Sequence, residues 1–327
     1  TQMGYNFICG ILRSYGDSVT PLLFLVISTA LNVALDVLFL TALNMGPAGA
    51  ALATVLTQAL SVVGCFAYTV IKYKPLRLKK EDFKAGFKSL WAHLKQGLPL
   101  GLQFSILAIG VIVMQSVIVK FDVKTDGIMV DGTPAQNGFG AGSKLFNFLI
   151  SFYNGLGAAI LGFNAQNYGK GNRENIRKGV LQSLVMTLII YVFCLIAALL
   201  LSINGAYQYV FMSADKISDA TVRFGNDYVY VAFFMYCVLG FLIVVRSAVQ
   251  GIGKSGYVLA AGVAELIART VICAFLPVIV NGGAINADAS RAAYIATCLG
   301  DPGAWTLASL VLLIPLFKDI LRCEKQK

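Results

Sequence analysis

Charged side chains are scarce in this 327-residue sequence. Asp, Glu, Lys and Arg make up 13% of the chain, whereas apolar residues make up 57% and the mean hydropathy is +0.75. Soluble globular proteins carry about 25% charged residues. Several apolar runs reach the roughly 20 residues that a helix needs to cross a bilayer, and the period-two alternation of an outer-membrane barrel is absent. The sequence therefore predicts an all-α membrane protein that crosses the bilayer several times.

Motifs for catalysis and for metal binding are also missing. The only histidine is His93, and the seven cysteines have no CxxC spacing, so neither a zinc site nor a disulfide framework is indicated. HExxH, GxSxG and Walker motifs are absent. The net charge of +10 reflects basic loops of a membrane protein rather than nucleic-acid binding. We therefore expect no enzyme activity, no metal site, no cofactor and no nucleic-acid partner.

Apolar length predicts eight complete spans. The first residues resemble the end of a further helix and lack an initiator Met, so we expect a segment before them. Lysines and arginines gather in alternate connections, which places those connections and the C-terminus in the cytoplasm. The predicted spans are 19–41, 47–71, 98–121, 139–165, 176–203, 225–250, 255–280 and 303–322.

Two short stretches indicate an internal repeat. LRSYGDS at 12–18 is echoed by VQGIGKS at 249–255, and six predicted spans separate the copies, as in parallel repeats. Between them, KKEDFKAGFKSLWAHLKQG predicts an amphipathic interfacial helix. We therefore predict three parts: the remnant of an N-terminal lobe at 1–71 (the end of span four with spans five and six), a cytoplasmic amphipathic linker at 72–97, and a C-terminal six-helix lobe at 98–327.

Two polar residues interrupt the apolar run LNVALDVLF. Asn32 and Asp36 are four positions apart and so share one helical face. At 1.5 Å per residue from the outer end near Thr41, Asp36 lies about 8 Å deep, and Thr54 of the next, antiparallel span lies about 9 Å deep. A structural hydrogen bond between helices would need no carboxylate, which is costly at this depth. We therefore favour a site for a small cation or a proton, with Gln58 one turn deeper.

Other polar residues within the spans have less specific interpretations. Glu265 and Arg269 are also four positions apart, and we interpret them as a structural ion pair within one helix. Arg246 and Lys144 lie near predicted span ends, where long basic side chains extend to the interface. CLGD at 298–301 lies in a predicted outer loop, and its Cys departs from the GxGD of intramembrane aspartyl proteases. Amides that would line a cavity or bond between helices are Gln58, Gln103, Gln115, Asn147, Asn154 and Asn164.

Several segments together resemble the multidrug and toxic compound extrusion (MATE) transporter family. ILRSYGDSVTP, LNVALDVLFL and GPAGAALATVLTQ are similar to the fourth-to-sixth span region of that family. GLPLGLQ, NAQNYGKGNRENIRK and VQGIGKSGYVLAAGVAELIART are similar to later parts of it. The resemblance implies two pseudo-symmetric six-helix lobes, the first incomplete here. It also implies a cation or proton site at Asn32, Asp36 and Thr54, completed by a first-span Asp that would precede this chain.

The resemblance also implies a function. It implies a secondary transporter of the plasma membrane that exchanges Na⁺ or H⁺ for organic, often cationic, drugs or toxic compounds, with a small organic substrate and the lipid bilayer as partners. We expect a monomer. Gln103 and Gly240 stand near positions where another branch of the family has acidic residues, so no coupling through the second lobe is expected.

Two alternatives remain open. A flippase for lipid-linked saccharides, from the same superfamily, should have a large cationic cavity. A membrane enzyme or non-transporting membrane protein would need a clustered catalytic set. The few arginines and lysines within the spans favour the antiporter.

Overall fold

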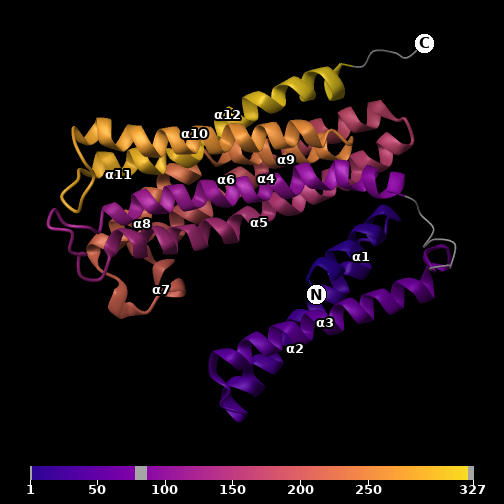
Figure 1. The fold of residues 1–327 in the computed structure, drawn as a ribbon, viewed down its shortest axis with the longest axis horizontal. Helices are drawn as coiled ribbons and strands as arrows, with labels where there is room; N and C mark the ends of the chain where they lie inside the picture. The colour runs from indigo at the N-terminus through magenta and orange to yellow at the C-terminus, as the bar shows by residue number, and fades with distance from the viewer. Residues whose placement is uncertain (1, 78–86, 323–327) are drawn as a thin grey trace. The chain divides into compact units, whose positions relative to one another are not determined.

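The computed structural model of the protein describes residues 2–77 and 87–322 and divides into two compact units, Thr1–Leu90 and Trp91–Lys327 (Figure 1). Each unit has its own buried hydrophobic cluster. Of the predicted linker at 72–97, residues 78–86 lie outside the described part of the chain. The described remainder contains a short helical turn at Lys74–Leu76 and the start of the first helix of unit 2.

Helices make up most of the described backbone. Unit 1 contains α1 (Gln2–Ser14), α2 (Val19–Val37) with a π-helical extension at Leu38–Ala42, and α3 (Gly46–Lys72). Unit 2 contains α4 (Phe87–Lys120, whose first residues precede the unit boundary), α5 (Pro134–Gly169), α6 (Arg173–Ser202), α7 (Gln208–Phe211), α8 (Asp219–Phe234), α9 (Tyr236–Gly251), α10 (Ser255–Asn281), α11 (Arg291–Cys298) and α12 (Gly300–Pro315), which continues as a π-helical turn at Leu316–Leu321.

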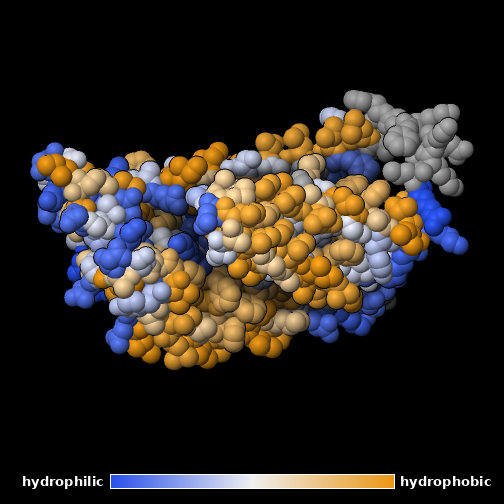
Figure 2. Space-filling view, turned by 90° about the horizontal axis from the view of Figure 1, so that it is seen from below, coloured by the Kyte–Doolittle hydropathy of each residue, from blue (hydrophilic) through white to orange (hydrophobic). Residues whose placement is uncertain are grey.

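The predicted spans agree with these helices. Within the described residues, seven helical segments are long and apolar enough to cross a membrane, and α8 with α9, bent by 54° around Met235, makes an eighth. Large apolar side chains remain exposed on them, for example Ile189 and Phe193 on α6 and Phe275 on α10. Figure 2 shows hydrophobic side chains over much of the surface in that view, as expected of a surface that contacts lipid.

The start of the last span differs from the prediction. It begins at Arg291 rather than at residue 303, because Ser290 caps a helical segment of small residues with its hydroxyl, which accepts from the Ala293 amide at 3.3 Å. The polar residues Arg291 and Asp301 interrupt the apolar run at its start. Apolar run length alone therefore predicts a later start for this span than the structure shows. Asp301 therefore lies inside the span, not in an outer loop.

A stripe of small residues allows α3 to pack closely. Its buried residues recur every four positions, and the Thr57, Ser61 and Thr69 hydroxyls donate to carbonyls of their own helix at 2.7 to 2.9 Å. Small residues and self-satisfied hydroxyls are typical of helix contacts in membranes. The buried stripe comprises Gly49, Ala53, Thr57, Ser61, Cys65 and Thr69.

The two repeat copies form the same type of turn. Gly16, between α1 and α2, and Gly253, between α9 and α10, have φ of +85° and +77°, a conformation that glycine adopts without strain. Asp17 follows the first glycine and lies 3.2 Å from Lys72 Nζ at the end of α3. In the second copy Lys254 follows the glycine and reaches an acidic residue at the chain's other end, Asp319, at 2.6 Å. Both copies of the repeat therefore have an ion pair at the residue after the glycine, but the acidic and basic positions are exchanged between them.

Candidate functional site

In unit 1, the structure places Asn32 and Asp36 one turn apart on a half-buried face of α2. Asn32 Nδ2 and Asp36 Oδ1 are buried, and neither has a hydrogen-bond partner within the described part of the chain. A buried polar atom without a partner costs about 1 to 3 kcal/mol. The pair therefore has unused hydrogen-bonding capacity among the described residues.

Thr54, the third residue of the predicted site, lies on the neighbouring helix α3. Its side chain is exposed, and its hydroxyl donates to the Ala50 carbonyl at 3.0 Å. The close contacts of Phe24 with Gly64 and of Phe39 with Gly49 set the antiparallel register of α2 and α3. This register leaves Asp36 and Thr54 within about one helical turn of each other in depth.

Gln58 lies elsewhere in unit 1. It lines a cavity of about 40 Å³ together with Tyr5, Leu25, Ser28 and Ser61. This volume exceeds the roughly 10 to 15 Å³ that a cavity needs to hold a water molecule. Gln58 thus belongs to a cavity within unit 1, whereas Gln103, Asn147 and Asn154 belong to unit 2.

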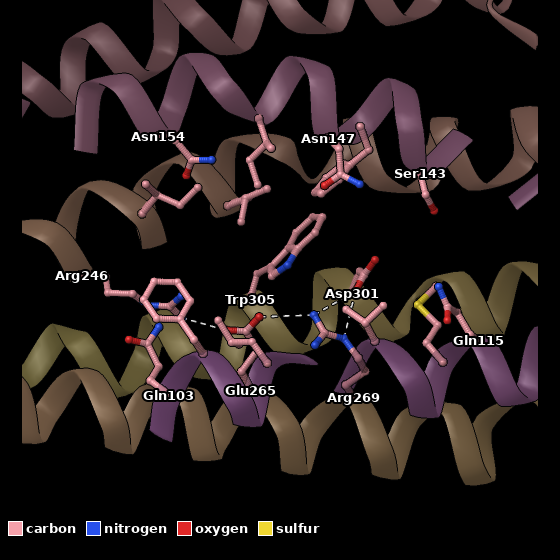
Figure 3. Close-up of a pocket in the computed structure, with 18 of the residues that line it drawn as sticks. Gln103, Gln115, Ser143, Asn147, Asn154, Arg246, Glu265, Arg269, Asp301 and Trp305 are labelled. Atoms are coloured by element: carbon pink, nitrogen blue, oxygen red, sulfur yellow. Dashed lines mark hydrogen bonds and ion pairs between the residues drawn. The ribbon is translucent and has the colours of Figure 1, made fainter. Parts of the chain in front are cut away.

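Unit 2 contains a larger cavity of about 390 Å³, enclosed by α4, α5, α8, α9, α10 and α12. Gln103 and Gln115 reach it from α4 and Asn147 and Asn154 from α5 (Figure 3). On α5 the positions of Ser143, Asn147 and Asn154 follow helical spacing, so one face presents all three. The remaining amide, Asn164, takes the other predicted role: it is buried and bonds between helices, donating from α5 to the Ala248 carbonyl of α9 at 3.4 Å.

A chain of charged side chains crosses one wall of this cavity (Figure 3). Arg246 Nη2 on α9 lies 2.7 Å from Glu265 Oε2, and Glu265 Oε1 lies 3.2 Å from Arg269 Nη2 on α10. Arg269 continues to Asp301 Oδ1 on α12 at 2.9 Å, and the Tyr228 hydroxyl is 3.3 Å from Asp301 Oδ2. The predicted pair of Glu265 and Arg269 is therefore present, but it is the centre of a network that joins four helices, α8, α9, α10 and α12.

Arg246 and Asp301, at the two ends of this network, differ from the positions predicted from the sequence. Arg246 was expected to extend to the interface, and that prediction is wrong: its side chain is only 14% exposed and is paired with Glu265. Asp301 was expected in an outer loop, and the structure instead buries it in the first turn of α12. The sequence did hold a signal for Asp301, because an acidic residue followed by Pro302 is typical of a helix N-terminus.

Glycines bring α4 close to the network. A β-carbon at Gly110 would lie 2.6 Å from Arg269 Nη1, and one at Gly262 would lie 2.8 Å from Gln103 Cγ. Any side chain at either position would displace a residue of the cavity wall. Close helix contact through glycine therefore positions both Arg269 and Gln103.

Three curated relatives are similar to parts of this chain. The probable multidrug resistance protein YpnP of Bacillus subtilis is 33% identical over 173 residues, which are 53% of this chain and 36% of YpnP. The probable multidrug resistance protein NorM of Thermotoga maritima is 24% identical over 200 residues, 58% of this chain and 40% of that protein. A FAD transporter of Shewanella oneidensis is 28% identical over 187 residues, 54% of this chain and 38% of that protein. The matches thus span well under half of these relatives.

Solved structures share the fold. A MATE protein in complex with MaL6 has a TM-score of 0.76 at 20% identity, covering 96% of this chain and 66% of that one. An outward-facing multidrug resistance MATE family transporter has a TM-score of 0.77 at 19% identity, with the same coverage of 96% and 66%. This chain therefore spans about two thirds of those proteins. The MatE family profile matches residues 102–275, more than half of the chain and most of the helices around the large cavity, so this protein belongs to the MatE family.

Proposed function

We propose that the whole protein is a secondary transporter of the plasma membrane that exchanges Na⁺ or H⁺ for amphipathic organic compounds, with its C-terminus in the cytoplasm. The observation that carries this proposal is the buried, unpartnered Oδ1 of Asp36 beside the unpartnered amide of Asn32, within the MatE fold. Two of the relatives are named as probable multidrug resistance proteins, which supports organic compounds as the exported substrates.

The chemistry of Asp36 suits coupling. An ionised carboxylate inside a span costs roughly 2.5 to 3.5 kcal/mol, and protonation or binding of Na⁺ neutralises it. Either event removes the uncompensated charge of Asp36 and so changes the stability of one arrangement of α2 relative to another. A ligand shifts a conformational equilibrium only by such a difference in affinity between states. Loading and release at Asp36 would thus be linked to the exchange between inward- and outward-open states.

The flippase alternative is less well supported. It calls for a large cationic cavity, whereas in the unit 2 cavity Arg246 and Arg269 are both paired with carboxylates. The paired network also gives no reason to propose an enzyme, because it leaves no nucleophile next to an available base. Transport of small amphipathic compounds is therefore the function that we retain.

Asp36→Asn tests the coupling role. In the full-length protein reconstituted in liposomes, we expect gradient-driven transport of ethidium to fall by at least about 100-fold, as for the loss of an essential charged group. Asp126→Asn, at an exposed loop position, is the matched control and should keep wild-type transport. Imposing the Na⁺ and the pH gradient separately identifies the coupling ion. Wild-type gradient dependence in Asp36→Asn would exclude this residue as the coupling site.

A further inference from the structure

Basic side chains gather at one end of unit 2, where the α5–α6 turn, the α9–α10 turn and the end of α12 meet (Figure 1). The acidic side chains described there are both engaged. Glu174 Oε1 lies 2.7 Å from Lys178 Nζ, and Asp319 Oδ1 lies 2.6 Å from Lys254 Nζ. The basic residues of this end that form no ion pair with any described residue are Lys170, Arg173, Arg177, Lys318 and Arg322. This end of the unit therefore carries uncompensated positive charge.

The charged side chains at the end of α12 lie on two sides of the helix. Asp319 faces inward: its side chain is 14% exposed and lines a small cavity with Arg173 and Ile176 of α6. Lys318 and Arg322, four positions apart, are exposed and line a groove on the surface. The described residues that line this groove are Ile314, Phe317, Lys318, Leu321 and Arg322. Among them are two cationic groups and no carboxylate.

An exposed apolar stripe leads from this groove along α12. Its members recur every three or four positions, so they share one face of the helix, and each is between 38% and 58% exposed. They are Leu307, Leu310, Ile314 and Phe317. At 1.5 Å per residue the stripe is about 15 Å long, which is half of the roughly 30 Å hydrocarbon core of a bilayer. When the stripe contacts the acyl chains of one leaflet, Lys318 and Arg322 therefore lie at the level of the headgroups.

We propose that this groove binds an anionic phospholipid. The phosphate of the lipid accepts hydrogen bonds from Lys318 and Arg322, and an acyl chain lies along the apolar stripe. A zwitterionic lipid binds less tightly, because its own ammonium competes with the two basic side chains for the phosphate. Clusters of basic residues at a membrane surface attract anionic lipids in the same way. The inference concerns a lipid site on unit 2 and requires neither the Asp36 site nor a gradient.

Phe317→Trp provides a local readout, because Phe317 lines the groove and is 58% exposed. The full-length protein is reconstituted in phosphatidylcholine bilayers in which part of the lipid is brominated phosphatidylglycerol or brominated phosphatidylcholine. Bromine on the acyl chains quenches tryptophan in contact with them, and the difference in emission between the Phe317→Trp protein and wild type isolates position 317. We expect brominated phosphatidylglycerol to quench this emission at a mole fraction at least about fivefold lower than brominated phosphatidylcholine, which is the factor that one basic residue near a membrane surface contributes.

Two charge-matched double substitutions, each made in the Phe317→Trp protein, locate the lipid. Lys318→Gln with Arg322→Gln should abolish the preference for phosphatidylglycerol at position 317. Lys170→Gln with Arg177→Gln removes the same charge from the same end of the unit, but outside the groove, and should change the preference by less than about twofold. All four side chains are exposed, so both variants should fold. Unchanged quenching by brominated phosphatidylcholine confirms that position 317 still faces lipid in each variant.

Three results would overturn the proposal. Equal quenching of the Phe317→Trp protein by the two brominated lipids would show that the groove does not select an anionic headgroup. An equal loss of preference in the two double variants would show a diffuse attraction to this end of the protein in place of a site. Absence of quenching by either lipid would show that another protein surface, such as a second copy of this chain, covers the groove. Since no gradient is applied, these outcomes are independent of whether Asp36 couples transport.

Discussion

Arg269 on α10 and Asp301 on α12 are joined by an ion pair of 2.9 Å in which the side chains are only 5% and 12% exposed. Asp301 is one of two acidic contacts of Arg269, the other being Glu265 on its own helix. This pair links α10 and α12 at the cavity wall. We therefore expect its loss to lower the stability of unit 2.

Asp301→Asn should destabilise unit 2 by about 3 kcal/mol, because it leaves two buried arginines, Arg246 and Arg269, with the single carboxylate of Glu265. The measurement is thermal unfolding followed with a thiol-reactive dye, which suits a chain whose described cysteines are nearly all buried. Asp288→Asn, an exposed change of the same type, is the control. Equal unfolding temperatures for the two variants would contradict the structural role of Asp301.

Gly240→Ala should destabilise the core by about 1 to 3 kcal/mol through overpacking. A β-carbon at Gly240 would lie 2.5 Å from both Thr187 Cγ2 and the Tyr153 ring. Gly162 on α5 is the matched control, because a β-carbon there meets no atom within 4 Å. Gly162→Ala should be neutral or stabilising by up to about 1 kcal/mol from helix propensity. The prediction fails if the two alanine variants unfold at the same temperature.

Asp17→Asn should lower the stability of unit 1 by about 1 kcal/mol at neutral pH, since Asp17 caps the start of α2. The Thr20 amide, the Tyr73 hydroxyl and the Thr20 hydroxyl, in that order, lower the pKa of Asp17 well below its ordinary value of 3.8. A lowered folded-state pKa means that the carboxylate stabilises the fold at all pH values above 3.8 and loses this effect as acid approaches the folded-state pKa.

The difference between wild type and Asp17→Asn should therefore be constant from pH 7 to about pH 4 and shrink at lower pH. Thermal unfolding of both proteins across this range measures it. Asp215→Asn, at an exposed position, should show no such pH-dependent difference. A difference in stability between wild type and Asp17→Asn that grows as the pH falls below about 4 would contradict this assignment.

The reversed polarity of the repeat suggests a charge exchange. Lys254→Asp replaces this ion pair by two acidic residues and should cost about 1 to 3 kcal/mol, between the values for exposed and buried pairs. Adding Asp319→Lys recreates the polarity of Asp17 and Lys72 and should restore more than half of the loss. A double-mutant cycle on unfolding temperatures gives the coupling. Additive effects of the two substitutions would show that the residues do not interact.

The helices could be predicted well from the sequence, but the site could be predicted only in part. Run length located the seven spans and the bent pair of α8 and α9, and Gln103, Asn147 and Asn154 were identified as polar amides within apolar spans that the structure places on one cavity. Helical spacing identified Glu265 and Arg269, because their contact is local to α10. Arg246 and Asp301 escaped because their contacts join helices 19 and 32 residues away along the chain.

What the sequence determined by itself was the class of protein, the number of spans and the turn shared by the repeats. These follow from local physics: backbone groups in lipid must bond within their own helix, and a left-handed turn favours glycine. Only the tertiary structure decided that Arg246, Glu265, Arg269 and Asp301 form one network and that the Thr54 hydroxyl bonds to a carbonyl of its own helix. Contacts between helices depend on how each helix is rotated and shifted against its neighbours, and no local pattern of residues specifies that.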